Sequence, residues 1–175
     1  MESMPPVTTP GVPAPPPIPV ERPGTRLLPV FDAPVTDRVW LVAAHGGAGC
    51  GTIYASSPGL YADAGRALPF CAGPARAPRI VLCAMGSAHG LESLRALLAE
   101  WDAGALAPCV LLGVAVTACM ARPPRALRRG CLQVGSVAPR LWRLPYVASI
   151  PVEGRPSSWP SGYRRMSSAL EGARR

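Results

Sequence analysis

Lysine and asparagine are absent from this sequence of 175 residues, and all 18 basic residues are arginine. Without lysine the chain can build neither a Schiff-base enzyme nor an ordinary phosphate-binding lysine site. Charged residues make up only 16% of the sequence and hydrophobic residues 49%, a balance that excludes a chain disordered throughout. The length is typical of one domain, with or without arms.

Metal ligands and paired cysteines are also scarce. The sequence has only two histidines, His45 and His89, and none of its six cysteines forms a C-x-x-C pair. We therefore expect free buried thiols, no zinc site and no disulfide. No basic head followed by an apolar run opens the chain, so we expect no signal peptide and a cytoplasmic location.

One uncharged stretch raises the question of a membrane span. Residues 103–121 are 19 positions without a charge, close to the roughly 20 needed to cross a bilayer. Pro108 and two glycines interrupt the stretch, and its dense part, residues 110–117, is rich in β-branched residues. This pattern predicts a strand buried on both faces rather than a membrane helix.

The proline content divides the chain. Residues 1–37 hold 11 of the 23 prolines and little periodic hydrophobicity, which predicts a disordered, extended arm resembling polyproline. Residues 38–152 carry the apolar runs and are expected to form the folded domain. Residues 153–175 are rich in Ser, Pro, Gly and Arg, which predicts a flexible basic tail that forms at most a marginal helix.

Within 38–152, apolar runs alternate with helical patterns. Strands are predicted at 39–44, 79–85, 110–117 and about 146–150, with a helix over 89–103 and a short helix over 122–129. This order predicts a small α/β domain with a mainly parallel sheet of about four or five strands and crossover helices.

A glycine-rich segment directly follows the first predicted strand. We call it the glycine loop; it comprises His45, Gly46, Gly47, Ala48, Gly49, Cys50, Gly51 and Thr52. In a phosphate-binding loop, glycines turn backbone N–H groups inward, a Lys contacts the outer phosphates and a Ser or Thr binds magnesium. Here Cys50 stands at the Lys position and Gly51 at the Ser/Thr position. ATP or GTP is therefore expected to bind weakly at most, with no metal and no catalytic residue.

The glycine loop has three other interpretations. A dinucleotide fingerprint would lack its third glycine and the acidic residue expected about 20 positions further on. An esterase oxyanion loop needs a nucleophile elbow, which Ser87 does not form, and a histidine later in the chain to act as base, but none follows His89. An ordinary glycine-rich turn between a strand and a helix stays open.

The loop resembles that of the deviant Walker ATPases of the partition and septum-site (ParA/MinD) type, which reads Lys-Gly-Gly-x-Gly-Lys-[Ser/Thr]-Thr. His45 stands at the signature Lys, Cys50 at the second Lys and Thr52 at the final Thr. Together with residues 62–66, 89–92 and 139–145, the loop is similar to an uncharacterised family of short actinobacterial proteins of this kind, often carried near mobile elements.

The resemblance covers residues 38–152 and implies a truncated P-loop NTPase-like domain. Because both Lys positions are lost and the strand 79–85 ends in Met85 without a Walker B Asp, it implies a protein that is not an enzyme. Such a pseudo-NTPase would act through a protein partner, in plasmid maintenance or conjugative transfer by analogy. A nucleotide-dependent switch that forms a homodimer is the alternative that the same resemblance implies.

Arginines are concentrated late in the predicted domain. Six lie in a window of 22 residues without an acidic residue: Arg122, Arg125, Arg128, Arg129, Arg140 and Arg143. This stretch predicts weak, salt-dependent binding of a polyanion, and it supports a third hypothesis, a nucleic-acid-binding accessory protein. Trp142 and Tyr146 could add stacking or belong to the core.

Overall fold

The computed structural model describes residues 26–72 and 76–172, with the side chain of Pro151 excepted. Its centre is a five-stranded parallel sheet in the order β3-β2-β5-β6-β7. These strands are Val39–Ala43 (β2), Tyr61–Gly65 (β3), Arg79–Met85 (β5), Val110–Thr117 (β6) and Leu141–Leu144 (β7). Two short strands, Val30–Asp32 (β1) and Leu68–Phe70 (β4), pair with each other in a second, parallel sheet.

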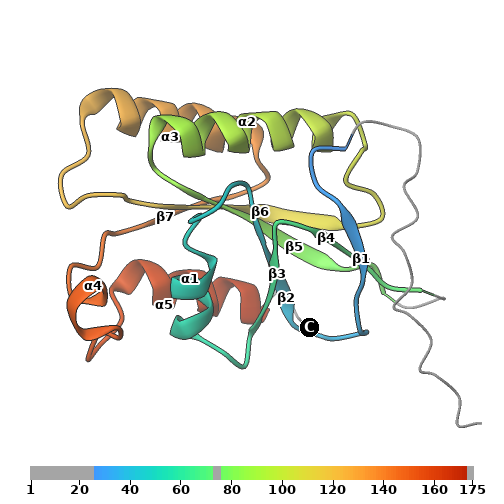
Figure 1. Ribbon diagram of the computed structural model, residues 1–175, viewed down its shortest axis with the longest axis horizontal. Coiled ribbons are helices and arrows are strands. Elements are labelled where there is room, and N and C mark those ends of the chain that lie inside the picture. Colours follow the sequence, from blue (N-terminus) through green and yellow to red (C-terminus); the bar gives the residue numbers. More distant parts are fainter. Residues whose placement is uncertain (1–25, 73–75, 173–175) are drawn as a thin grey trace, which may run out of the picture.

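Helices cover both faces of the five-stranded sheet (Figure 1). Ala88–Asp102 (α2) and Arg125–Val137 (α3) lie on one face, and Cys50–Ser56 (α1), Ile150–Glu153 (α4) and Ser161–Gly172 (α5) lie on the other. Each face has its own core of buried apolar side chains. The protein is therefore a three-layer α/β structure, and the predicted mainly parallel sheet with crossover helices is confirmed.

The central strands form where the sequence has continuous apolar runs. All of β2 is buried, and so is β5 except at Met85, as expected of parallel strands covered on both sides. The uncharged stretch 103–121 is not one helix, because its most apolar part, residues 110–117, forms β6 as predicted. No helix in the described part of the chain is both long and apolar enough to cross a membrane.

The helix predicted over 89–103 is α2, displaced by one residue. Ser87 caps it by accepting a hydrogen bond from the Gly90 N–H at 3.1 Å. Leucines at helical spacing face the sheet, and Gly104 follows the helix with a positive φ of 76°. Capping and periodicity thus determine this element locally.

Two predictions near the end of the sheet are wrong. The last strand is Leu141–Leu144, not 146–150; Pro145 follows it directly and has no N–H to continue a ladder, and Ile150 begins α4 instead. The helix predicted over 122–129 starts at Arg125 and continues to Val137.

The strand β3 was not predicted at all. It lies at the sheet edge beside β2, and its residues alternate between buried and exposed positions, with Asp63 and Gly65 exposed. Such an edge strand carries no continuous apolar run, so its pattern is weak in the sequence.

The predicted domain limits are too narrow at both ends. Of the predicted arm 1–37, residues 1–25 lie outside the described residues, but Leu28 is buried in the core and β1 lies within 26–37. Of the predicted tail, α5 packs onto the sheet with Tyr163, Met166 and Leu170 buried. The described domain therefore extends from residue 26 to residue 172.

Candidate functional site

The glycine loop lies at the point where the strand order reverses. The chain passes from β2 through α1 to β3 on one side, whereas β5, on the other side of β2, leads into α2 on the opposite face. In open α/β sheets, ligands bind outside the carboxyl ends of the strands at such a switch point. The fold thus places the glycine loop, the segment after Met85 and the end of β6 at one edge of the sheet.

His45 fastens the glycine loop to the end of β5. Its Nε2 accepts a hydrogen bond from the Met85 N–H at 3.1 Å, so the proton of the neutral ring is on Nδ1, which donates to the Gly46 carbonyl oxygen at 2.7 Å. The side chain is 7% exposed, and the ring of His89 packs edge-on at 5.3 Å between centroids. Both nitrogens are therefore occupied by backbone groups, and the ring has no free donor to offer an anion.

Gly47 and Gly49 allow the loop to turn sharply. Their φ angles are 77° and 86°, in the left-handed region that favours glycine, and Gly49 is the N-cap residue directly before α1. A Cβ atom at Gly49 would lie 3.1 Å from Thr117 Oγ1, so the loop passes closely over the end of β6. Gly46, Gly47 and Gly51 are exposed, Thr52 is partly exposed, and Ala48 is buried.

Cys50 points into the protein. It is 7% exposed and belongs to the core cluster between α1, α5 and the sheet. The pKa of the Cys83 thiol on β5 is raised, chiefly by a hydrogen bond with Cys50 and also by burial. The position where the resemblance would require an outward Lys is therefore occupied by a thiol directed at the sheet.

Thr117 adds a buried hydroxyl at the same edge. Its side chain is 7% exposed, and Oγ1 has no hydrogen-bond partner among the described residues. Burial raises the pKa of the nearby Tyr163 phenol to about 12, an effect that Thr117 partly offsets, and the phenol donates to the Pro145 carbonyl oxygen at 3.4 Å. Thr117 is not among the site residues predicted from the sequence; a Thr that ends a buried strand is the signal that could have identified it.

Groups that could hold a metal are not assembled in the described residues. In 26–72 and 76–172, no cluster of three or more His, Cys, Asp or Glu side chains is placed to bind an ion. The six thiols are free. The strands that flank the glycine loop end in Met85 and Thr117, neither of which supplies a carboxylate.

The predicted arginine stretch separates into two parts. Arg125, Arg128 and Arg129 are exposed on α3, and Arg122 is exposed just before it. Arg143 lies on β7 at the sheet edge, where its charge lowers the pKa of Cys131 on α3 although burial raises that pKa overall. We call these five residues the arginine face.

Arg140 lies apart from the arginine face. Its guanidinium carbon is 5.8 Å from the ring centre of Trp142, which is 9% exposed and packs in the core on the α1 and α5 side. Trp142 is thus a core residue, whereas Tyr146 is 38% exposed.

Comparison with known proteins gives no relative: no family model, no curated protein and no solved structure matches the chain.

Proposed function

We propose that this protein is a non-catalytic α/β binding protein that acts through a polyanionic partner, which it contacts with the arginine face of α3. The phosphate backbone of a nucleic acid is the partner that best suits five arginines, because guanidinium groups pair with phosphate and release counterions.

The observation that carries the proposal is the unneutralised charge of α3. The sequence has no Asp or Glu between Asp102 and Glu153. Within residues 26–72 and 76–172, the side chains of Arg122, Arg125, Arg128 and Arg129 form no hydrogen bond or ion pair. On α2, Arg95 donates to Gln133 Oε1 of α3 at 3.2 Å and adds a positive charge beside them. Such a surface is electrostatically complementary to a chain of phosphates.

The glycine loop supports the non-catalytic part of the proposal. Phosphoryl transfer requires a cation at the phosphates and a held metal. The resemblance implies Lys at two positions. The first is occupied by His45, whose two ring nitrogens both form hydrogen bonds with backbone groups, and the second by Cys50, whose side chain lies in the core. The loop therefore serves as a tight connection between β2 and α1.

Binding to double-stranded DNA at varied salt concentration tests the proposal. If four or five phosphates are contacted together, log K should fall with log [salt] with a slope of about −4. The variant R125E/R128E/R129E should lose this binding. The control R38E/R164E/R165E lowers the net charge equally, from +8 to +2, but changes exposed residues outside the arginine face and should retain most of it. Equal losses in both variants, or no salt-dependent binding by the unmodified protein, would contradict the proposal.

A second candidate function is a nucleotide-dependent switch. The position of the glycine loop at the switch point and the unpartnered hydroxyl of Thr117 favour it. Titration with Mg²⁺-ATP and Mg²⁺-GTP, followed by the backbone amide resonances of Gly46, Gly47 and Gly51, distinguishes the two. Saturable shifts at micromolar nucleotide would favour the switch, and their absence would favour the binding protein.

A further inference from the structure

The two ends of α3, the helix that carries most of the arginine face, differ in chemistry. The helix joins β6 to β7, which are parallel neighbours, so it starts near the carboxyl ends of the strands and returns toward their amino ends. Arg125 therefore lies at the first of these ends and Val137 at the second. A polyanion that is longer than α3 continues past at least one of them.

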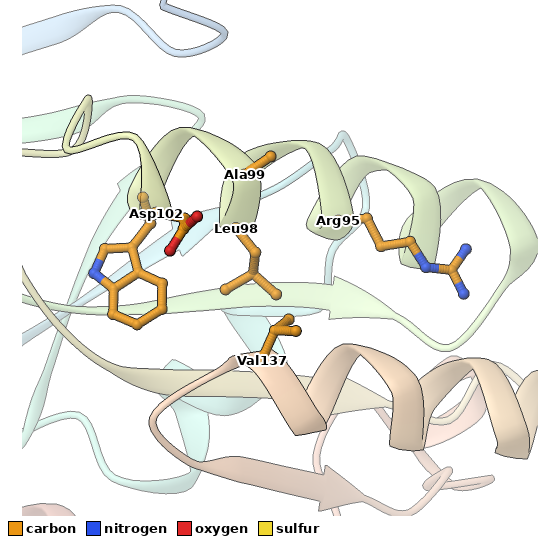
Figure 2. A pocket seen from close by; sticks show the side chains of 6 residues that line it. Arg95, Leu98, Ala99, Asp102 and Val137 are labelled. Atoms are coloured by element: carbon orange, nitrogen blue, oxygen red, sulfur yellow. The ribbon is translucent and has the colours of Figure 1, made fainter.

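The end of α3 at Val137 opens into a hollow between α2 and α3 (Figure 2). Its volume is about 320 Å³, and Leu98 and Val137 face one another across it. Asp102 lies toward the end of the hollow farther from Arg95, and its side chain is exposed. An exposed carboxylate repels phosphate groups, and apolar side chains offer them no hydrogen bond. This end of α3 is therefore unsuited to a nucleic-acid backbone.

The other end of α3 adjoins two segments that leave neighbouring strands. The Ala118 N–H donates to the Leu144 carbonyl oxygen at 2.8 Å, so the segments after β6 and β7 start side by side. Met120 is two residues beyond Ala118, and Tyr146 is two residues beyond Leu144. Arg122 lies on the path from β6 to α3. The arginine face therefore continues, at the carboxyl ends of β6 and β7, into a surface with an aromatic and a thioether side chain.

Tyr146 and Met120 are uncovered at this place. Tyr146 is 38% exposed and Met120 42% exposed, whereas Val147, the next residue after Tyr146, packs into the core on the α1 and α5 side. The Tyr146 phenol forms no hydrogen bond with any of the described residues. An exposed aromatic ring beside arginines is the arrangement with which proteins bind unpaired bases, because the ring stacks on a base while the arginines contact the backbone.

We propose that the polyanion bound by the arginine face is a single-stranded nucleic acid, one base of which stacks on Tyr146 beside Met120. The inference rests on the proposed function, because α3 has to bind the phosphates. Bases in a duplex are paired and stacked on one another, so a duplex can use only the charges of the arginine face. A single strand can turn its bases outward and adds the stacking contact to the same charges.

Two single strands with the same number of phosphates separate stacking from charge: an oligothymidylate and an abasic strand of equal length. In fluorescence anisotropy, the full chain should bind the oligothymidylate about tenfold more tightly than the abasic strand. Tyr146→Ala should remove this difference and leave the affinity for the abasic strand unchanged, which also shows that the variant is folded. Tyr146→Phe keeps the ring and should retain the difference.

The methyl resonance of Met120 supplies a second measurement at the site itself. It should shift on addition of the oligothymidylate and stay in place on addition of the abasic strand, because only a base brings a ring current to the methyl group. A Met120 signal that does not respond to the oligothymidylate would show that no base stacks at this surface, and the inference would be wrong.

The remaining outcomes distinguish the stacking inference from the proposed function. Equal affinity for the two strands, or a difference that persists in Tyr146→Ala, would overturn the inference and leave salt-dependent binding by the arginine face intact. Binding of both strands by R125E/R128E/R129E with unchanged affinity would contradict the proposed function, and so would the absence of binding by the unmodified protein. In either of these cases the stacking inference is also wrong.

Discussion

Gly90 in the first turn of α2 lies against the ring of His45, so that a Cβ atom added there would come within 2.9 Å of Nε2. The same atom would lie even closer to the carbonyl oxygen of Met85. The glycine therefore permits α2 to start where β5 ends, while His45 accepts the Met85 N–H. The start of α2, the end of β5 and the hydrogen bond that holds the glycine loop to β5 therefore all require that residue 90 has no side chain.

Gly90→Ala is expected to destabilise the protein by several kcal/mol, although replacing a helical glycine by alanine normally stabilises. The clash involves backbone, which can move only if α2 or β5 shifts. Urea unfolding followed by circular dichroism measures the loss. Gly51→Ala is the matched control: nothing lies within 4 Å of its added Cβ, so it should stabilise by about 0.5–1 kcal/mol. Equal effects of the two substitutions would contradict the packing described for Gly90.

The contrast between what the sequence predicted and what it missed has a physical basis. Central strands such as β2 and β6 are buried on both faces, so apolar residues fill them continuously and the pattern is strong. The edge strands β3 and β7 alternate, and Arg143 in β7 is exposed, so their patterns are weak. Their pairing depends on distant segments that no local pattern contains.

The same limit applies to the candidate site. The sequence located the glycine loop after a buried strand, and the fold places it at the switch point. It did not give the direction of Cys50, because that depends on how α1 rotates against β5 and Cys83. The burial of α5 was not predicted for a similar reason. Its apolar residues are few, and the burial of Tyr163, Met166 and Leu170 depends on packing against a sheet that distant segments form.

Cys50→Lys should lower the free energy of unfolding by about 3 kcal/mol or more, because it would bury an unpaired ammonium beside Cys83. The substitution Gly51→Ser at an exposed, open position should have little effect and serves as the control. Neither variant, nor C50K/G51S, should gain affinity for Mg²⁺-ATP or hydrolyse it. Isothermal titration and a phosphate-release assay provide the measurements. A tenfold or larger rise in affinity of C50K/G51S would instead show that the glycine loop is a decayed phosphate cradle.

Leu170→Ala in α5 should destabilise the protein by about 2–5 kcal/mol, because Leu170 is only 1% exposed and its removal leaves a cavity against the sheet. Arg165→Ala, at an exposed position of the same helix, should change stability by no more than about 0.5 kcal/mol. Chemical denaturation of the full chain compares the two. An unchanged midpoint for Leu170→Ala would mean that residues 161–172 form a tail that does not pack on the domain.

Alkaline pH should destabilise the protein through its buried thiols, and Cys109 is the group to follow. Burial raises the pKa of Cys109 from 9.0 to about 11, partly offset by the charge of Arg26. Below pH 9 the thiol is protonated in both folded and unfolded chains, and its contribution to stability is complete. Between pH 9 and 11 the unfolded chain loses the proton that the folded chain keeps, so the free energy of unfolding falls as the pH rises.

Urea unfolding at pH 8, 10 and 11 under reducing conditions measures this fall, and Cys109→Ala should make it shallower than in the unmodified protein. A fall must remain in the variant, because the pKa of Cys83 is also raised, chiefly by its hydrogen bond with Cys50, and that of Cys131 by burial. Tyr61 and Tyr163 add to the fall above pH 10, where the unfolded tyrosines lose their protons, since burial raises the pKa of each in the folded protein to about 12. An identical pH dependence in Cys109→Ala and the unmodified chain would show that the Cys109 thiol ionises freely in the folded protein, and therefore that the segment between α2 and β6 does not cover it.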